Sequence, residues 1–103
     1  MTSDPVDLLV KLIKCKSVTP NDDGALAVIE NILKKNNFKS QRLVFGTGKD
    51  KVENLFLRLG SKSPHLCFAG HTDVVPAGDD SLWTQSPFGG DIEGNKIFGR
   101  GAV

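Results

Sequence analysis

The chain has 103 residues, fewer than the roughly 150 of a typical domain, so it holds at most one domain. Hydrophobic residues make up 39% and charged residues 24%, as in an ordinary globular protein. Thirteen basic and twelve acidic residues give a net charge of +1, which argues against a nucleic-acid or anionic membrane partner bound by bulk charge. No apolar stretch is long enough for a transmembrane helix, and Met1–Pro5 lacks the features of a secretory signal. We therefore expect a cytoplasmic protein without a membrane partner.

The two cysteines, Cys15 and Cys67, form no CxxC pair. A disulfide framework or a cysteine-based zinc site would need more thiols at closer spacing. We expect both residues to be small, buried and reduced.

Two amphipathic helices are predicted in the first third of the chain. The first is capped by Asp4, has Pro5 at its first position and runs to about Lys16. Turn-forming residues occupy 17–24, and a second helix is predicted over 25–36. Its inward-facing residues should be Leu26, Val28, Ile29, Ile32 and Leu33.

Strands are predicted from Phe38 onward. Residues 41–45 and 52–59 should form a hairpin around a turn at 46–51. The unbroken apolar run within 65–70 predicts a strand buried on both faces, and 96–98 predicts a short strand after a long loop. This order implies an α/β layered domain, with two helices followed by an incomplete mixed sheet.

Two glycine-containing segments invite a nucleotide-binding interpretation. Gly46-Thr47-Gly48-Lys49 lacks the other residues of a phosphate loop and is better explained as a hairpin turn. Gly99-Arg100-Gly101 is only part of a dinucleotide fingerprint. A dinucleotide-binding module therefore stays as an alternative of another class, as does a non-catalytic interaction fragment using the loop around Trp83 and Phe88.

His71-Thr72-Asp73 is the strongest candidate site, because it follows the predicted buried strand where α/β sheets place binding groups. Residues two apart on an extended segment point the same way, so the two side chains can share a pocket. A neutral imidazole is a good zinc ligand, and a nearby carboxylate can fix its orientation. From these residues alone, plain capping of the strand and the following turn remains open. His65 is expected to be a strand-edge imidazole, and Asp79 and Asp80 solvated turn residues.

Longer motifs carry a family resemblance. They are, in chain order, Ser17-Val18-Thr19-Pro20, Phe68-Ala69-Gly70-His71-Thr72-Asp73-Val74-Val75-Pro76-Ala77-Gly78-Asp79, Trp83-x-x-x-Pro87-Phe88 and Gly94-x-x-x-x-Gly99-Arg100-Gly101-Ala102. Together they resemble the metal-binding N-terminal segment of the dizinc aminoacylase/carboxypeptidase superfamily. The likeness spans essentially all 103 residues.

The resemblance implies roles for two residues and for a cofactor. His71 corresponds to a ligand of one zinc ion, and Asp73 to the catalytic-site residue that supports this ligand. It further implies two zinc ions per full-length subunit, replaceable by cobalt, in a cytoplasmic homodimer acting on a small-molecule substrate. The fold would be the first part of a zinc-exopeptidase-like catalytic domain.

The resemblance also implies that residues 1–103 are the N-terminal portion of the catalytic domain. The family's metal-bridging aspartate would come directly after Val103, and the catalytic glutamates and the dimerisation domain would follow. We therefore expect this chain to be inactive by itself.

Within the superfamily, the motifs are most similar to enzymes that cleave the amide of N-succinyl-LL-2,6-diaminopimelate to succinate and LL-2,6-diaminopimelate. That reaction serves lysine and peptidoglycan precursor biosynthesis. Acetylornithine deacetylases, or another amidohydrolase or peptidase of the superfamily, are the alternative.

Overall fold

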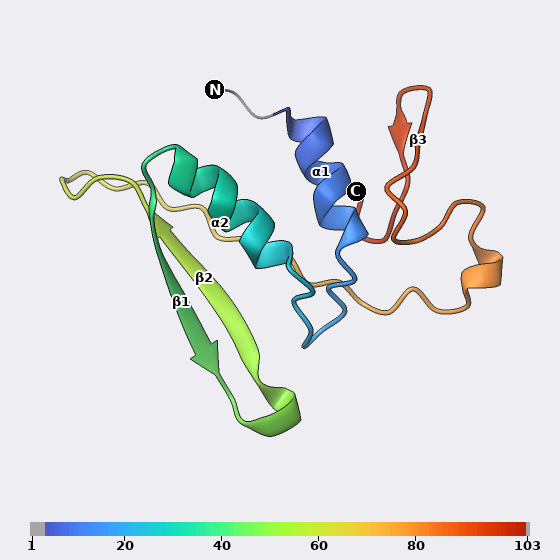
Figure 1. Ribbon diagram of the computed structural model, residues 1–103, viewed down its shortest axis with the longest axis horizontal. Coiled ribbons are helices and arrows are strands. Elements are labelled where there is room, and N and C mark those ends of the chain that lie inside the picture. Colours follow the sequence, from blue (N-terminus) through green and yellow to red (C-terminus); the bar gives the residue numbers. More distant parts are fainter. Residues whose placement is uncertain (1–3, 103) are drawn as a thin grey trace.

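The computed structural model describes residues 4–102 (Figure 1). The expectations that concern residues 1–3 and the chain end at Val103 lie outside the described residues. The elements are α1 (Pro5–Lys14), α2 (Ala25–Lys35), β1 (Lys39–Phe45), β2 (Val52–Arg58), β3 (Ile92–Glu93), β4 (Lys96–Ile97) and the short 3₁₀ helices η1 (Gly48–Asp50) and η2 (Asp80–Leu82).

Both predicted helices are confirmed, and local capping explains their bounds. At the start of α1, the Asp4 carboxylate accepts a hydrogen bond from the Val6 amide at 2.9 Å. This helix ends before the predicted Lys16, because Cys15 is extended and the Lys16 amide donates to the Asp23 carboxylate instead. The turn before α2 is closed by Asp22, whose carboxylate accepts from two amides that the helix start leaves free.

The small core lies where α1 meets α2 and the end of the chain. Ile13, Ala25 and Leu26 are its buried apolar residues. Gly99 packs directly on α1, since a Cβ atom there would collide with Cγ2 of Ile13. Figure 1 accordingly shows the C-terminal end of the chain beside α1.

The predicted hairpin is confirmed as the antiparallel pair β1–β2, with Lys39 opposite Arg58 and Phe45 opposite Val52. Ser40 and Arg42 lie opposite Leu57 and Leu55, so these four side chains share one face.

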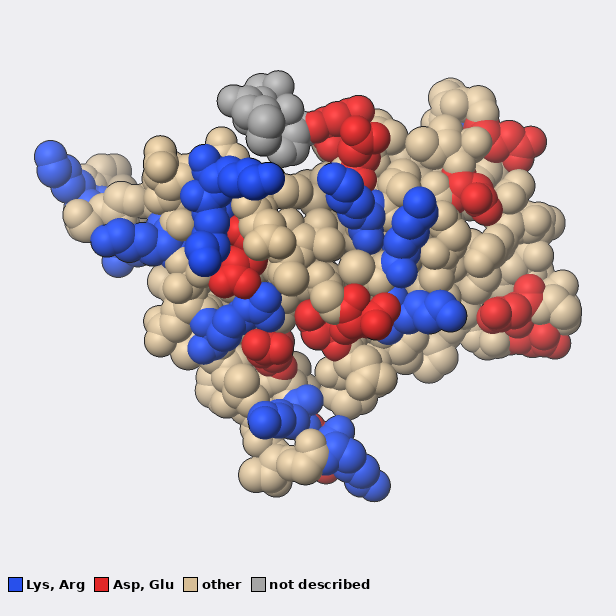
Figure 2. All heavy atoms as spheres, viewed as in Figure 1, with Lys and Arg blue, Asp and Glu red and all other residues tan. Residues whose placement is uncertain are grey.

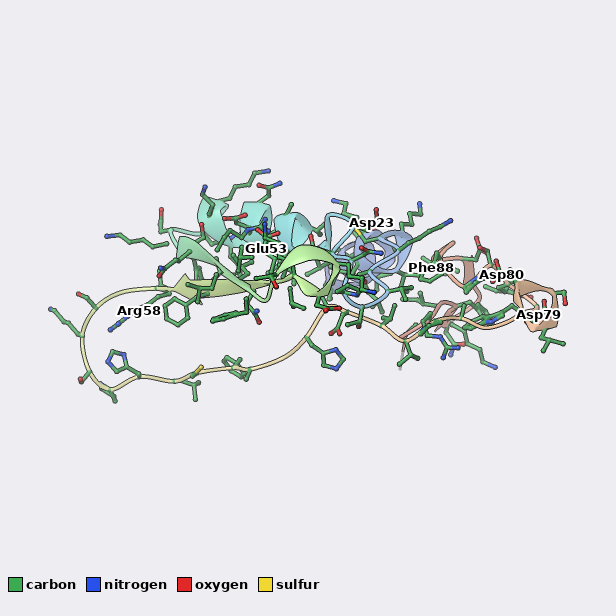
Figure 3. All side chains as sticks on the ribbon, turned by 90° about the horizontal axis from the view of Figure 1, so that it is seen from below. Asp23, Glu53, Arg58, Asp79, Asp80 and Phe88 are labelled. Carbon is green, nitrogen blue, oxygen red and sulfur yellow. The ribbon has the colours of Figure 1, made fainter. Side chains whose placement is uncertain are left out.

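That face is directed at α2. Glu30 on α2 accepts hydrogen bonds from the Ser40 hydroxyl at 2.7 Å and from the Arg42 guanidinium at 2.7 Å. The contacts fix the helix across the hairpin, and Figure 3 shows both helices on this side of it.

The predicted buried strand at 65–70 is wrong. These residues form no strand, and the side chains of Leu66 and Phe68 are 82% and 89% exposed. An extended apolar run becomes a buried strand only when neighbouring strands and layers cover it, and no described segment pairs with it. Figure 3 shows this part of the chain passing on the side of the hairpin opposite the helices.

The expectation of two buried cysteines is also wrong. Cys67 is exposed as part of the same segment, while Cys15 is half-buried at the end of α1. Both thiols are free, as the spacing predicts. Burial raises the pKa of the Cys15 thiol, and Asp23 and Asp22 nearby act in the same direction.

The end of the described chain forms a second, smaller hairpin. The predicted strand at 96–98 is confirmed as β4, which pairs with β3. The two helices and small antiparallel sheets together form an incomplete α/β domain, as predicted, but the described strands form two separate antiparallel sheets in place of one mixed sheet. No helix among residues 4–102 is long and apolar enough to cross a membrane. Figure 2 shows basic and acidic side chains mixed over the middle of the visible face, whereas only acidic ones appear at its right-hand end, over η2 and β3.

Candidate metal-binding site

The structure brings His71 and Asp73 together. Nδ1 of His71 lies 3.0 Å from Oδ1 of Asp73 and 3.0 Å from the backbone oxygen of the same residue. A carboxylate and a carbonyl only accept hydrogen bonds, so Nδ1 carries the proton of the neutral ring. Nε2 then keeps its lone pair, which is the arrangement of a histidine that binds a metal through Nε2.

The second carboxylate oxygen of Asp73 is also engaged. The Thr19 hydroxyl donates to Oδ2 at 2.5 Å, across 54 positions of sequence. This hydrogen bond, followed by the one from His71, lowers the pKa of Asp73 from its ordinary value, and together they outweigh the opposing effect of burial. The group is therefore a carboxylate with both oxygens directed by neighbours.

Backbone contacts join the same two segments. The Val74 amide donates to the Ser17 carbonyl at 2.9 Å, and the Thr19 amide donates to the Val74 carbonyl at 3.3 Å, forming an isolated parallel bridge between Val18 and Val74. The Ser17 hydroxyl donates to the Thr72 carbonyl at 2.7 Å, and Ser17 is only 2% exposed. We call residues 17–19 and 72–74 the clamp.

An open hollow of about 580 Å³ lies beside the clamp. Its lining includes Thr19, His71 and Asp73 as well as Trp83 and residues 97–102. The imidazole is 83% exposed and so is accessible to a bound group.

The loop that carries Trp83 is fixed against the hollow. The indole N–H donates to the Ala77 carbonyl at 3.0 Å, and the Arg100 guanidinium lies 5.0 Å from the ring centroid. Arg100 also donates to the Ala77 carbonyl at 3.4 Å. Trp83 is thus part of the lining of the hollow.

The remaining sequence candidates lie away from the hollow. Asp79 and Asp80 are at the outer end of the loop (Figure 3), where Asp79 accepts from the Ser81 amide and hydroxyl as a turn residue. His65 is exposed and lies near Arg58. Gly46 has φ +85° in the β1–β2 turn, which confirms the hairpin interpretation of that glycine segment.

The sequence does not predict the clamp as part of the site. Its local pattern places Ser17 and Thr19 in a turn, and only the family resemblance includes their motif. Their partners lie 55 and 54 positions away, and no local pattern reveals such a contact.

The donor set around the hollow is incomplete. Among residues 4–102 there is no group of three or more His, Cys, Asp or Glu side chains that could hold a metal ion. The described chain thus offers one imidazole nitrogen and the carboxylate that directs it, which suits one ligand of a larger site.

Comparison with known proteins gives the class first. Residues 67–103, which include His71, Asp73 and most of the lining of the hollow, match the model of Peptidase family M20/M25/M40. The part of the chain that holds the candidate site is thus similar to that peptidase family.

Curated relatives then extend the similarity to the whole chain. It is 52% identical over its full length to the succinyl-diaminopimelate desuccinylase of Rhodospirillum centenum, covering 27% of that protein. Proteins of the same name from Parvibaculum lavamentivorans and Ehrlichia canis are 51% and 48% identical, over 97% and 100% of the chain and 26% and 27% of their own lengths. The chain spans about a quarter of the length of these relatives.

Proposed function

We propose that this chain is the N-terminal portion of the catalytic domain of a metal-dependent amidohydrolase. The complete protein would cleave the amide of N-succinyl-LL-2,6-diaminopimelate to succinate and LL-2,6-diaminopimelate. The names of the relatives support the substrate, and the generally metal-dependent family that matches residues 67–103 supports the class. The observation that carries the proposal is His71, whose Nδ1 is held by Asp73 so that Nε2 is free to bind a metal.

The residues of this chain have defined tasks in that reaction. His71 would bind one of two zinc ions through Nε2, and Asp73 would keep the ring in the required tautomer and orientation. When bound, zinc would lower the pKa of a water molecule and polarise the amide carbonyl, and cobalt could take its place. The open hollow beside His71 leaves room for a small-molecule substrate. The remaining metal ligands and the general base come from the rest of the protein, which we propose to be a cytoplasmic homodimer.

The test is a calorimetric zinc titration of the complete protein and its His71→Ala variant, with hydrolysis of the succinylated substrate assayed in parallel. We expect His71→Ala to lose one zinc site and the activity. His65→Ala is the matched control, because it removes the chain's other histidine at a distance from the hollow. Unchanged zinc stoichiometry and turnover in His71→Ala would contradict the proposal.

We also propose that the 103-residue chain is inactive by itself, because one imidazole cannot hold two metal ions and a water. Turnover of the succinylated substrate by the purified chain would contradict this part of it.

A further inference from the structure

We propose that Thr19 is a positioning residue of this site: its hydroxyl fixes the Asp73 carboxylate and thereby holds His71 ready to bind a metal. The inference rests on the proposed function, because it assigns Thr19 a role in metal binding. It depends on three features, which are the hydrogen bond to Asp73, the anchoring of Thr19 itself and the shared use of one carboxylate.

The Asp73 carboxylate needs an external anchor. The terminal torsion of an aspartate has a broad, roughly two-fold energy profile, so the side chain alone does not hold one oxygen toward a neighbour. The Thr19 hydroxyl engages Oδ2 at 2.5 Å, and Oδ1 then lies 3.0 Å from Nδ1 of His71. With Oδ2 released, the carboxylate could rotate and Oδ1 would leave the ring, so that Nδ1 would be held by the Asp73 backbone oxygen alone.

Thr19 is itself held in place. Its amide donates to the Val74 carbonyl, and the preceding residue bridges to Val74, so its backbone is joined to the strand-like segment that carries Asp73. The following proline restricts Thr19 to an extended backbone, and its β-branched side chain has few rotamers. The hydroxyl is thus presented to Asp73 by a rigid support.

The competing interpretation is that Thr19 only holds the clamp together. Buried Ser17 already serves that purpose through its hydroxyl contact with Thr72 and its backbone contact with Val74. Thr19 differs from Ser17 because it is connected to His71 through the two carboxylate oxygens of half-exposed Asp73. The two interpretations predict different behaviour when only the Thr19 hydroxyl is removed.

The experiment compares Thr19→Val, which keeps the shape but removes the hydroxyl, with Thr19→Ser, which keeps the hydroxyl, both in the complete protein. Zinc affinity is measured by calorimetry. The tautomer of His71 is measured in the metal-free protein by ¹⁵N NMR at about pH 8, where an ordinary imidazole is neutral. Melting temperature reports on the clamp.

We expect Thr19→Val to weaken zinc binding about tenfold or more, the usual effect of losing a group that supports a metal ligand. The His71 signal should change from the Nδ1-protonated form to a mixture of tautomers. Thr19→Ser should keep both properties near those of the unaltered protein. If Thr19→Val does not fold, Thr19→Ala provides the same comparison.

Wild-type zinc affinity and tautomer in a folded variant without the hydroxyl would overturn the inference, whatever its melting temperature. His71→Ala separates this outcome from failure of the proposed function. If His71→Ala loses a zinc site while Thr19→Val is unaffected, only the role of Thr19 is refuted. If His71→Ala binds zinc normally, the proposed function itself is refuted.

Discussion

At the scale of single residues, Glu30 is the carboxylate that connects the helices to the hairpin. It accepts hydrogen bonds from Ser40 and from both Nε and Nη2 of Arg42, at 2.7, 3.0 and 2.7 Å. The Ser40 hydrogen bond first, and then those of Arg42, hold the pKa of Glu30 below its ordinary value of 4.5. Stability thus depends on the ionised form of Glu30.

This dependence gives a prediction about pH. A carboxylate with a lowered pKa in the folded state contributes stability above its unfolded pKa, and the contribution is lost as the pH falls through the folded pKa. We expect Glu30→Gln to lower the melting temperature near neutral pH and to flatten its decline below about pH 4.5. Thermal melting of the complete protein between about pH 7 and about pH 3 checks this.

Glu53→Gln is a suitable comparison, because Glu53 contacts the same guanidinium from β2 at 3.2 Å. Glu53→Gln should alter the decline of the melting temperature at acidic pH less than Glu30→Gln does. Parallel pH curves for the unaltered protein and Glu30→Gln would show that Glu30 does not carry the effect.

The site residues differ in how far sequence could predict them. His71 and Asp73 are two positions apart, so alternation along an extended segment was enough to place their side chains together, as the structure confirms. Thr19 is 54 positions from Asp73, and turn chemistry around Pro20 gave no indication of that contact. Long-range partners of a short motif require three-dimensional information.

At the scale of elements, local signals predicted those that depend on local interactions. Asp4 and Pro5 begin α1 as their capping preferences predict, and the turn at 46–51 closes the β1–β2 hairpin. The strand prediction for 65–70 is wrong because apolar residues indicate burial without specifying which neighbours cover them.

The contact between Gly99 and α1 gives a prediction for packing. A side chain at residue 99 would collide with buried Ile13, so we expect Gly99→Ala to cost about 1–3 kcal/mol of unfolding free energy. Ile13→Ala, by comparison, leaves a cavity and should cost about 2–5 kcal/mol. Denaturant unfolding of the complete protein measures both changes.

The double variant is the control for this contact. Ile13→Ala removes the Cγ2 atom that the new methyl group would strike, so the combined cost should be smaller than the sum of the two single costs. Strictly additive losses of unfolding free energy would show that a side chain at residue 99 does not collide with Ile13.

At the scale of the whole molecule, the described chain is flat and expanded. Its radius of gyration is 15.5 Å, whereas a compact domain of 100 residues has about 13 Å, and its shortest extent is 20 Å. Large apolar side chains such as Leu66 and Phe68 are therefore left in solvent. Exposed apolar groups of this size favour association.

We expect the purified 103-residue chain to self-associate and to bind a hydrophobic dye such as ANS. Replacing two of the most exposed apolar side chains, through Leu66→Lys and Phe68→Lys, should reduce both effects because charge opposes association. Light scattering and dye fluorescence measure them. A chain that stays monomeric and binds no dye would contradict the expectation.

The clamp has one more consequence, which concerns the length of the chain between its two halves. Residues 20–71, with α2 and the whole β1–β2 hairpin, form a closed loop between Thr19 and Thr72. The entropy of closing a flexible loop rises only slowly, by about 0.6 kcal/mol for each doubling of its length. Extra residues at the solvent-exposed tip near Gly48 would thus scarcely disturb the clamp. The hairpin can change in length while the end of the molecule that holds the candidate site keeps its geometry.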